Sequence, residues 1–154
     1  HLRPRRQRQM CIRDSLSAEE LTPDAKKGHE LFSTVCATCH RFRGEGQEIG
    51  PDITDVRNKP WQGLLSDILD PNRAIEARWT AYTLTLKDGR ALLGLIAAET
   101  ADSVTIRGPG VSETIARNDI ASMTELGQSL MPVGMEGALD KQQMADLIAF
   151  LQGR

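Results

Sequence analysis

At 154 residues, the chain is long enough for about one domain. It contains no run of about 20 apolar residues, so the sequence predicts no membrane-spanning helix. Residues 1–15 carry five arginines and one aspartate; without them, 14 Lys and Arg face 20 Asp and Glu, a net charge of −6. An acidic domain without a basic stripe binds nucleic acid poorly, so we expect no nucleic-acid partner.

The first sixteen residues differ in composition from the rest of the chain. The segment 1–8 is rich in arginine and lacks the apolar stretch and the small-residue cleavage site of a secretory signal. Residues 10–15 read like one translated frame of a sequencing-library adapter. We therefore predict that residues 1–16 are a non-native or disordered tail, with a natural basic tail as the alternative.

A first helix is predicted to begin near Thr22. The threonine can cap a helix, Pro23 suits the first helical position, and Asp24 suits the positive end of the helix dipole. Apolar residues then recur at helical spacing and lead directly to Cys36. These residues are Ala25, Gly28, Leu31, Phe32 and Val35.

The run Cys36-Ala37-Thr38-Cys39-His40 has the attachment signature of a c-type haem. Two thiols three positions apart can form thioether bonds to the two haem vinyl groups. The histidine that follows is then held beneath the iron. The motif therefore predicts a covalently attached haem and makes electron transfer the leading hypothesis.

Three other interpretations of this motif are weaker. A structural zinc site needs four ligands, and the remaining Cys and His residues are Cys11, His1 and His29. A thioredoxin-like motif follows a strand, whereas a helical pattern precedes this one. A disulfide within the motif would close a very small loop and leave the histidine without a role.

The middle of the chain has the pattern of a sheet. A short helix is predicted over residues 60–69 and is ended by Asp70 and Pro71. Apolar or alternating segments separated by turns then follow. They span residues 80–86, 91–98, 103–107, 111–115 and 120–124. Four or five such strands predict a small antiparallel sheet or barrel of about 45–50 residues.

A second amphipathic helix is predicted close to the end of the chain, with Asp140 as its cap. Its apolar residues share one face. They are Met144, Leu147, Ile148 and Leu151. Because both amphipathic helices must bury a face, we expect them to pack on each other, with Gly28 allowing a close approach to Phe150.

In combination, these segments resemble class I cytochrome c. The shared features are the first helix, the CxxCH motif, Gly50-Pro51-Asp52, a Met-Pro step at Met131 and the last helix. More narrowly, the chain is similar to a haem-binding domain at the C-terminus of large secreted planctomycete and verrucomicrobial proteins. Residues 68–75, the strand-rich insert and residues 129–132 carry this narrower resemblance, which covers about residues 24–152.

The resemblance implies a mainly α cytochrome c fold with an inserted small antiparallel β-sheet or barrel, an α+β arrangement. Residues 17–76 would form its N-terminal part with CxxCH, and 77–126 the β-rich insert. Residues 127–154 would form its C-terminal part with the distal methionine and the terminal helix. The insert would account for the 91 positions between the motif histidine and that methionine.

The resemblance also implies one covalent haem c and its ligands. Cys36 and Cys39 would be the thioether anchors, and His40 and Met131 the axial ligands of the iron. The carbonyl of Pro51 would accept the ring N–H of His40 and so orient the imidazole.

Other side chains compete for the distal position. Met135 lies four residues beyond Met131 in a glycine-rich segment and is the alternative distal ligand. Met144 falls on the core face of the last helix, and Met123 falls in a predicted strand. His29 is expected to be a solvent-facing helix residue rather than a second axial ligand.

The leading hypothesis is an electron-transfer domain rather than an enzyme. Its partner would be a redox protein, or a dehydrogenase-like domain fused to it in a larger secreted protein. The alternatives are a haem enzyme or gas sensor with an open distal site, such as a peroxidase, and a non-haem interaction module. Covalent haem implies a periplasmic or other extracytoplasmic location, with the signal peptide missing from this fragment.

Overall fold

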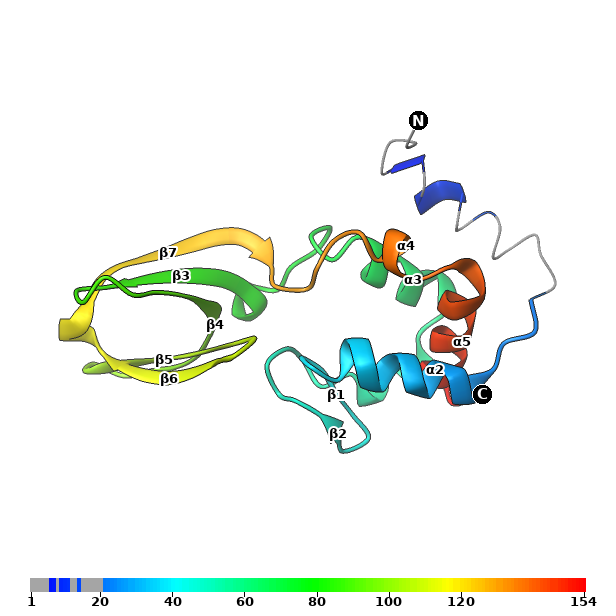
Figure 1. The fold of residues 1–154 in the computed structure, drawn as a ribbon, viewed down its shortest axis with the longest axis horizontal. Helices are drawn as coiled ribbons and strands as arrows, with labels where there is room; N and C mark the ends of the chain where they lie inside the picture. The colour runs from blue at the N-terminus through cyan, green and yellow to red at the C-terminus, as the bar shows by residue number, and fades with distance from the viewer. Residues whose placement is uncertain (1–5, 8, 12–13, 15–20) are drawn as a thin grey trace.

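The computed structural model describes residues 6–7, 9–11, 14 and 21–154. These residues form a helical part and a β-sheet part that lie at opposite ends of the long axis of the molecule (Figure 1). The predicted tail, residues 1–16, lies mostly outside the described residues. None of the described helices has the length and hydrophobicity to span a membrane.

The helical part contains α2 (Ala25–Leu31), α3 (Trp61–Leu69), α4 (Met135–Ala138) and α5 (Lys141–Gln152). The cap of α2 is Asp24, two positions after the predicted Thr22, and its carboxylate accepts the N–H groups of Lys26 and Lys27. Asp140 caps α5 as predicted. It forms a capping box with Gln143, in which each side chain accepts the backbone N–H of the other residue.

Helices α2 and α5 pack closely, which confirms the expected contact. A Cβ atom at Gly28 would overlap the carbonyl oxygen of Asp146 and would lie 2.8 Å from the Cβ of Phe150. Glycine is therefore required for the helices to approach this closely. The buried side chains of the first core are Phe32, Phe42, Leu64, Leu65, Ile68, Leu69, Met135, Leu139, Met144, Leu147, Ile148 and Leu151.

The sheet part contains five antiparallel strands in the order β6-β5-β4-β3-β7. Their bounds are β3 Thr80–Leu86, β4 Ala91–Glu99, β5 Ser103–Gly108, β6 Val111–Ala116 and β7 Ile120–Ser129. The predicted strands are confirmed, although β7 runs five residues beyond its predicted end at Thr124. Strands β6 and β7 form the two edges of the sheet, so it is open rather than a closed barrel (Figure 1).

The prediction of a mainly α fold with a small inserted sheet is wrong. The sheet has five strands of six to ten residues, beside helices α2, α3 and α5 of seven, nine and twelve residues. It also buries a core of its own, separate from the helical core. That second core consists of Leu84, Leu86, Leu92, Val104, Ile106 and Ile115. Because these side chains bury one another, the sheet is a structural unit in its own right.

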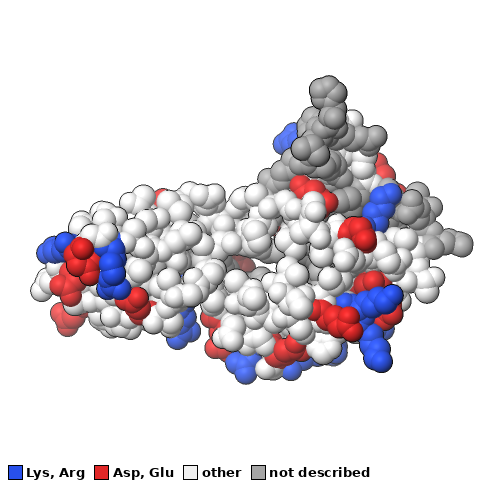
Figure 2. Space-filling view, in the orientation of Figure 1, with Lys and Arg blue, Asp and Glu red and all other residues white. Residues whose placement is uncertain are grey.

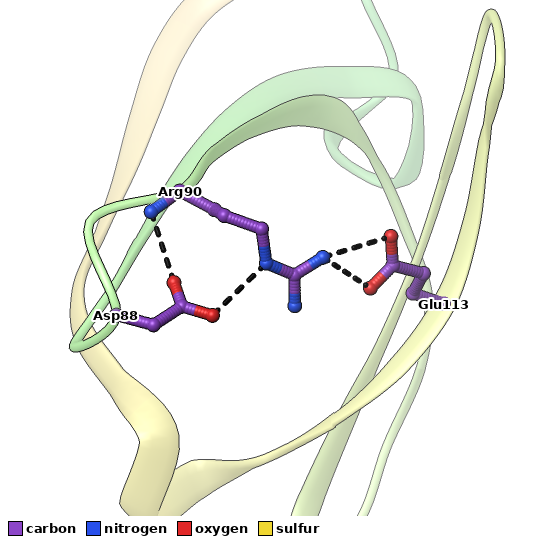
Figure 3. Close-up of polar contacts among 3 residues, drawn as sticks. All are labelled: Asp88, Arg90 and Glu113. Atoms are coloured by element: carbon purple, nitrogen blue, oxygen red, sulfur yellow. Dashed lines mark hydrogen bonds and ion pairs between the residues drawn. The ribbon is translucent and has the colours of Figure 1, made fainter.

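Charged side chains form ion pairs at the end of the sheet that lies away from the helices. Arg90, just before β4, donates from Nε to Asp88 at 3.0 Å and from Nη1 to Glu113 of β6 at 3.1 Å (Figure 3). All three side chains are exposed, and exposed pairs of this kind contribute little to stability. Figure 2 shows charges over the far end of the sheet, over the helical part and along the lower edge of the molecule, whereas the upper surface between sheet and helices is mostly uncharged.

Candidate haem-attachment site

The site begins where the α-helix α2 passes into a π-helix. The helix continues directly into a π-helix, Phe32–Cys36, whose first residue is fully buried in the helical core. The N–H of Ala37 closes it by donating to the carbonyl of Phe32 at 2.8 Å. Such π-helical turns are rare and occur often at functional sites. Here the turn delivers Cys36 at the last position of the helix.

The CxxCH motif forms a compact turn on this helix end. The N–H groups of Cys39 and His40 both donate to the carbonyl of Cys36, at 3.1 and 2.8 Å. Cys36 and Cys39 are free thiols and both are half-buried. Two thiols therefore lie on one turn, next to the histidine.

A loop that follows the motif folds back against His40. The N–H groups of Ile49 and Gly50 donate to the carbonyl of Cys39 at 3.2 and 2.7 Å. This places Nδ1 of His40 2.8 Å from the carbonyl oxygen of Pro51. A carbonyl can only accept, so Nδ1 donates the proton, and in the neutral ring Nε2 then has the lone pair that can bind a metal.

Two glycines permit this approach. A Cβ atom at Gly50 would lie 3.1 Å from Cε1 of His40, so a larger residue would push the loop away from the ring. Gly46 has φ of +98°, and a Cβ atom there would overlap the carbonyl oxygen of His40. Glycine at these two positions therefore allows the loop backbone to lie directly against His40.

The chemistry of the donors fits haem better than zinc. Burial raises the pKa of the Cys36 thiol to about 11, and Cys39 adds to the shift in the same direction. Zinc binds the thiolate and must displace this proton, so the raised pKa makes zinc binding less favourable. Within the part of the chain that the structure describes, no three His, Cys, Asp or Glu side chains are grouped to hold a metal ion.

The methionines differ sharply in burial. Met131 is half-buried and packs against the helical core, as do Cys36 and Ala37 of the motif. Met135 begins α4 and is 8% exposed, and Met144 of α5 is fully buried in the same core. Met123 lies on β7 and is 39% exposed. Met131 therefore borders the same core as the motif, whereas Met135 is a buried member of that core.

Two residues to which the sequence assigned no role hold the segment that leads into Met131. The side chain of Asn72 accepts the N–H of Ser129, and the hydroxyl of Ser129 accepts the N–H of Met131. A serine two positions before the methionine is the sequence signal for such a turn. No local pattern links Asn72 to Ser129, which is 57 positions away.

His29 occupies a different place, on the surface. Its ring is about half-exposed and stacks on Phe150, with 4.9 Å between ring centroids. Its Nε2 lies 2.6 Å from a carboxylate oxygen of Glu45. The expected solvent-facing position is confirmed, and its Nε2 is engaged by the carboxylate.

A turn with two thiols and an oriented imidazole, at the end of a helix that packs on the C-terminal helix, has the donor set that a c-type haem needs. The residues present fit the group because they offer two protein thiols and one imidazole nitrogen with a free lone pair.

Comparison with known proteins agrees with this geometry. The sequence model of the cytochrome c family matches residues 25–105, and the chain belongs to that family. Membership implies a domain that binds haem c covalently. The matched range includes the motif and Pro51 but ends before Met131.

Individual relatives match over shorter stretches. The chain is 58% identical over 63 residues to cytochrome c of Cochliobolus lunatus, which is 40% of this chain and 58% of that protein. It is 56% identical over 66 residues to cytochrome c of Arabidopsis thaliana, 42% of this chain and 59% of that protein. The match to cytochrome c of Stellaria longipes is 38% identical over 63 residues, with the same coverage as the first. The chain thus spans a little under three fifths of the length of these relatives.

Proposed function

We propose that this chain is an electron-transfer domain with one haem attached through Cys36 and Cys39, and with His40 and Met131 as axial ligands. The observation that carries the proposal is the contact between Nδ1 of His40 and the carbonyl of Pro51, at 2.8 Å. It fixes the ring and leaves Nε2 available to iron. A haem held in this way supplies a reversible one-electron couple between Fe(II) and Fe(III).

The protein contributes position and electronic tuning. The Pro51 carbonyl accepts a hydrogen bond from the imidazole, which orients the ring and strengthens it as a donor. A thioether from Met131 would raise the reduction potential relative to a second nitrogen ligand. These roles need no general acid or base, because an electron is transferred without making or breaking bonds in a substrate.

The test is a spectroelectrochemical titration of the haem-loaded protein, with exposure of the reduced form to carbon monoxide. We expect a reversible one-electron transition, low-spin spectra in both states, and no rapid carbon monoxide complex because Met131 holds the distal position. A high-spin reduced form that binds carbon monoxide at once would contradict electron transfer with His/Met ligation. That result would favour the haem enzyme or gas sensor.

We further propose that the domain works outside the cytoplasm, as the terminal electron acceptor of a larger secreted dehydrogenase-like protein. The resemblance to haem-binding domains of planctomycete and verrucomicrobial proteins supports this arrangement. Expression with and without a secretory leader, beside c-type maturation machinery, tests the location. Haem should be attached only to the exported form, and equal attachment in the cytoplasm would contradict it.

A further inference from the structure

The segment that carries Met131 leaves the sheet at an irregular end of β7. Ser129, the last residue of β7, lies opposite Thr80 of β3, and Glu125 lies opposite Tyr82. Between these two pairs, β7 advances by four residues while β3 advances by two. Gly127, one of the extra residues of β7, has φ of +62°. This bulge redirects the strand so that it ends beside the first residue of β3.

Two hydrogen bonds then fix the start of the Met131 segment. The amide oxygen of Asn72 accepts the backbone N–H of Ser129 at 2.7 Å. The hydroxyl of Ser129 accepts the backbone N–H of Met131 at 3.1 Å. The second bond is the tight turn in which a serine side chain binds the N–H two residues later. Together they form a chain from Asn72 to the backbone of Met131.

Asn72 is itself held by the helical part. It lies in a turn directly after α3, closed by the N–H of Arg73, which donates to the carbonyl of Asp70 at 3.1 Å. The buried face of α3 belongs to the helical core that Met131 also packs against. The turn that carries Asn72 is thus attached to the end of α3. The segment that contains Ser129 and Met131 is in turn bonded to the side-chain oxygen of Asn72.

We propose that Asn72 and Ser129 are positioning residues for Met131, holding its segment so that the thioether competes effectively with external ligands for the iron. The proposal rests on the His/Met ligation proposed above. Since both bonds involve backbone N–H groups of the segment, their loss frees the segment without removing any side chain from the core.

Paired variants separate the hydrogen bonds from other effects. Asn72→Ala removes the acceptor, whereas Asn72→Asp keeps an oxygen at the same place. Ser129→Ala removes the hydroxyl, whereas Ser129→Thr keeps it. The matched controls are Asn118→Ala and Ser122→Ala, at exposed positions elsewhere in the sheet part.

The measurements are imidazole affinity of the oxidised haem-loaded protein and hydrogen exchange of the backbone amides of Ser129 and Met131. Asn72→Ala and Ser129→Ala should bind imidazole about fivefold more tightly, as expected for loss of one hydrogen bond that opposes ligand exchange. The amide that loses its acceptor should exchange faster by a similar factor. Asn72→Asp, Ser129→Thr and the controls should match the unsubstituted protein.

Met131→Ala is the reference that tells two failures apart. If it does not tighten imidazole binding, the proposed ligation is wrong and this inference fails with it. If Met131→Ala tightens binding but Asn72→Ala and Ser129→Ala do not, the ligation stands and the inference alone is overturned. Unchanged amide exchange in both of those variants would also overturn it.

Discussion

At the scale of single residues, the site contains the oriented imidazole of His40 and the two thiols of Cys36 and Cys39. His40 is fixed by the carbonyl of Pro51, a contact that the resemblance implied and that the structure contains. The contact depends on the loop conformation that Gly46 and Gly50 permit. Of these two glycines, the resemblance included Gly50 but not Gly46. Met131 as ligand stays a prediction, supported by its half-buried place against the helical core.

Met131→Ala should leave the haem attached, because the thioether anchors are untouched, but should convert the iron to a high-spin form that exchanges ligands. The measurement is the visible spectrum of the oxidised protein, before and after addition of imidazole. Met123→Ala is the matched control, because this methionine is 39% exposed on β7. An unchanged low-spin spectrum in Met131→Ala would transfer the ligand role to Met135 or another group.

The half-buried thiol of Cys36 predicts a pH dependence that exists only before haem attachment. Its pKa is raised from 9.0 to about 11 in the fold, so the folded protein binds the proton more tightly than the unfolded chain. The resulting stability is present below pH 9 and is lost as the pH rises from 9 towards 11.

Urea unfolding of the haem-free protein between pH 7 and pH 11 should show this loss, and Cys36→Ala should show less of it. The haem-loaded protein should lack this contribution, because a thioether does not titrate. Equal pH dependence of the haem-free protein and of Cys36→Ala would contradict the burial of the thiol.

At the scale of elements, the contact between α2 and α5 supports the haem-bearing turn. Gly28 allows the backbones to meet beside Asp146, and Phe150 then lies 5.6 Å from the ring of Phe32, between centroids. Phe32 is the first residue of the π-helix that ends at Cys36. Phe150 of α5 therefore packs on the residue that begins the turn leading to the CxxCH motif.

Gly28→Ala should destabilise the protein by about 3 kcal/mol, because the new methyl group meets backbone that cannot move aside easily. The measurement is thermal or urea unfolding followed by circular dichroism. Gly137→Ala in α4 is the control, since a Cβ atom there meets nothing within 4 Å. A loss in Gly28→Ala no larger than in Gly137→Ala would refute the close helix contact.

Local patterns predicted these elements well. The 3.6-residue spacing identified α2 and α5, and alternation with turns identified β3 to β7. The cap of α2 was misplaced by two positions, because both Thr22 and Asp24 have capping side chains and only the contacts choose between them. The π-helix could not be predicted, since its apolar spacing also fits an ordinary helix.

At the scale of the whole molecule, the chain buries two separate cores, one among helices and one within the sheet. The sequence predicted the strands but did not predict that they form a sheet with a hydrophobic core of its own. The expectation of a mainly α protein came from the resemblance, whereas buried side chains of β3, β4, β5 and β6 build a second core. Likewise, the link between Asn72 and Ser129 depends on tertiary proximity that no local pattern contains.

Two cores predict that the sheet can loosen while the haem site persists. Ile106→Ala removes a fully buried side chain from the sheet core and should cost about 3 kcal/mol. Hydrogen exchange should accelerate for the amides of β4 and β5, while those of α2 and α5 and the haem spectrum stay as in the unsubstituted protein. Equal acceleration in α2 and α5 would show instead that the molecule unfolds as one cooperative unit.

The central claim is that this chain carries one haem covalently on Cys36 and Cys39. The most direct measurement is the mass and visible spectrum of the protein produced with c-type maturation machinery and then denatured, beside the Cys36→Ala/Cys39→Ala variant. The account predicts one haem per chain that survives denaturation and is absent from the double variant. Haem that is released on denaturation, or that remains bound to the double variant, would contradict it.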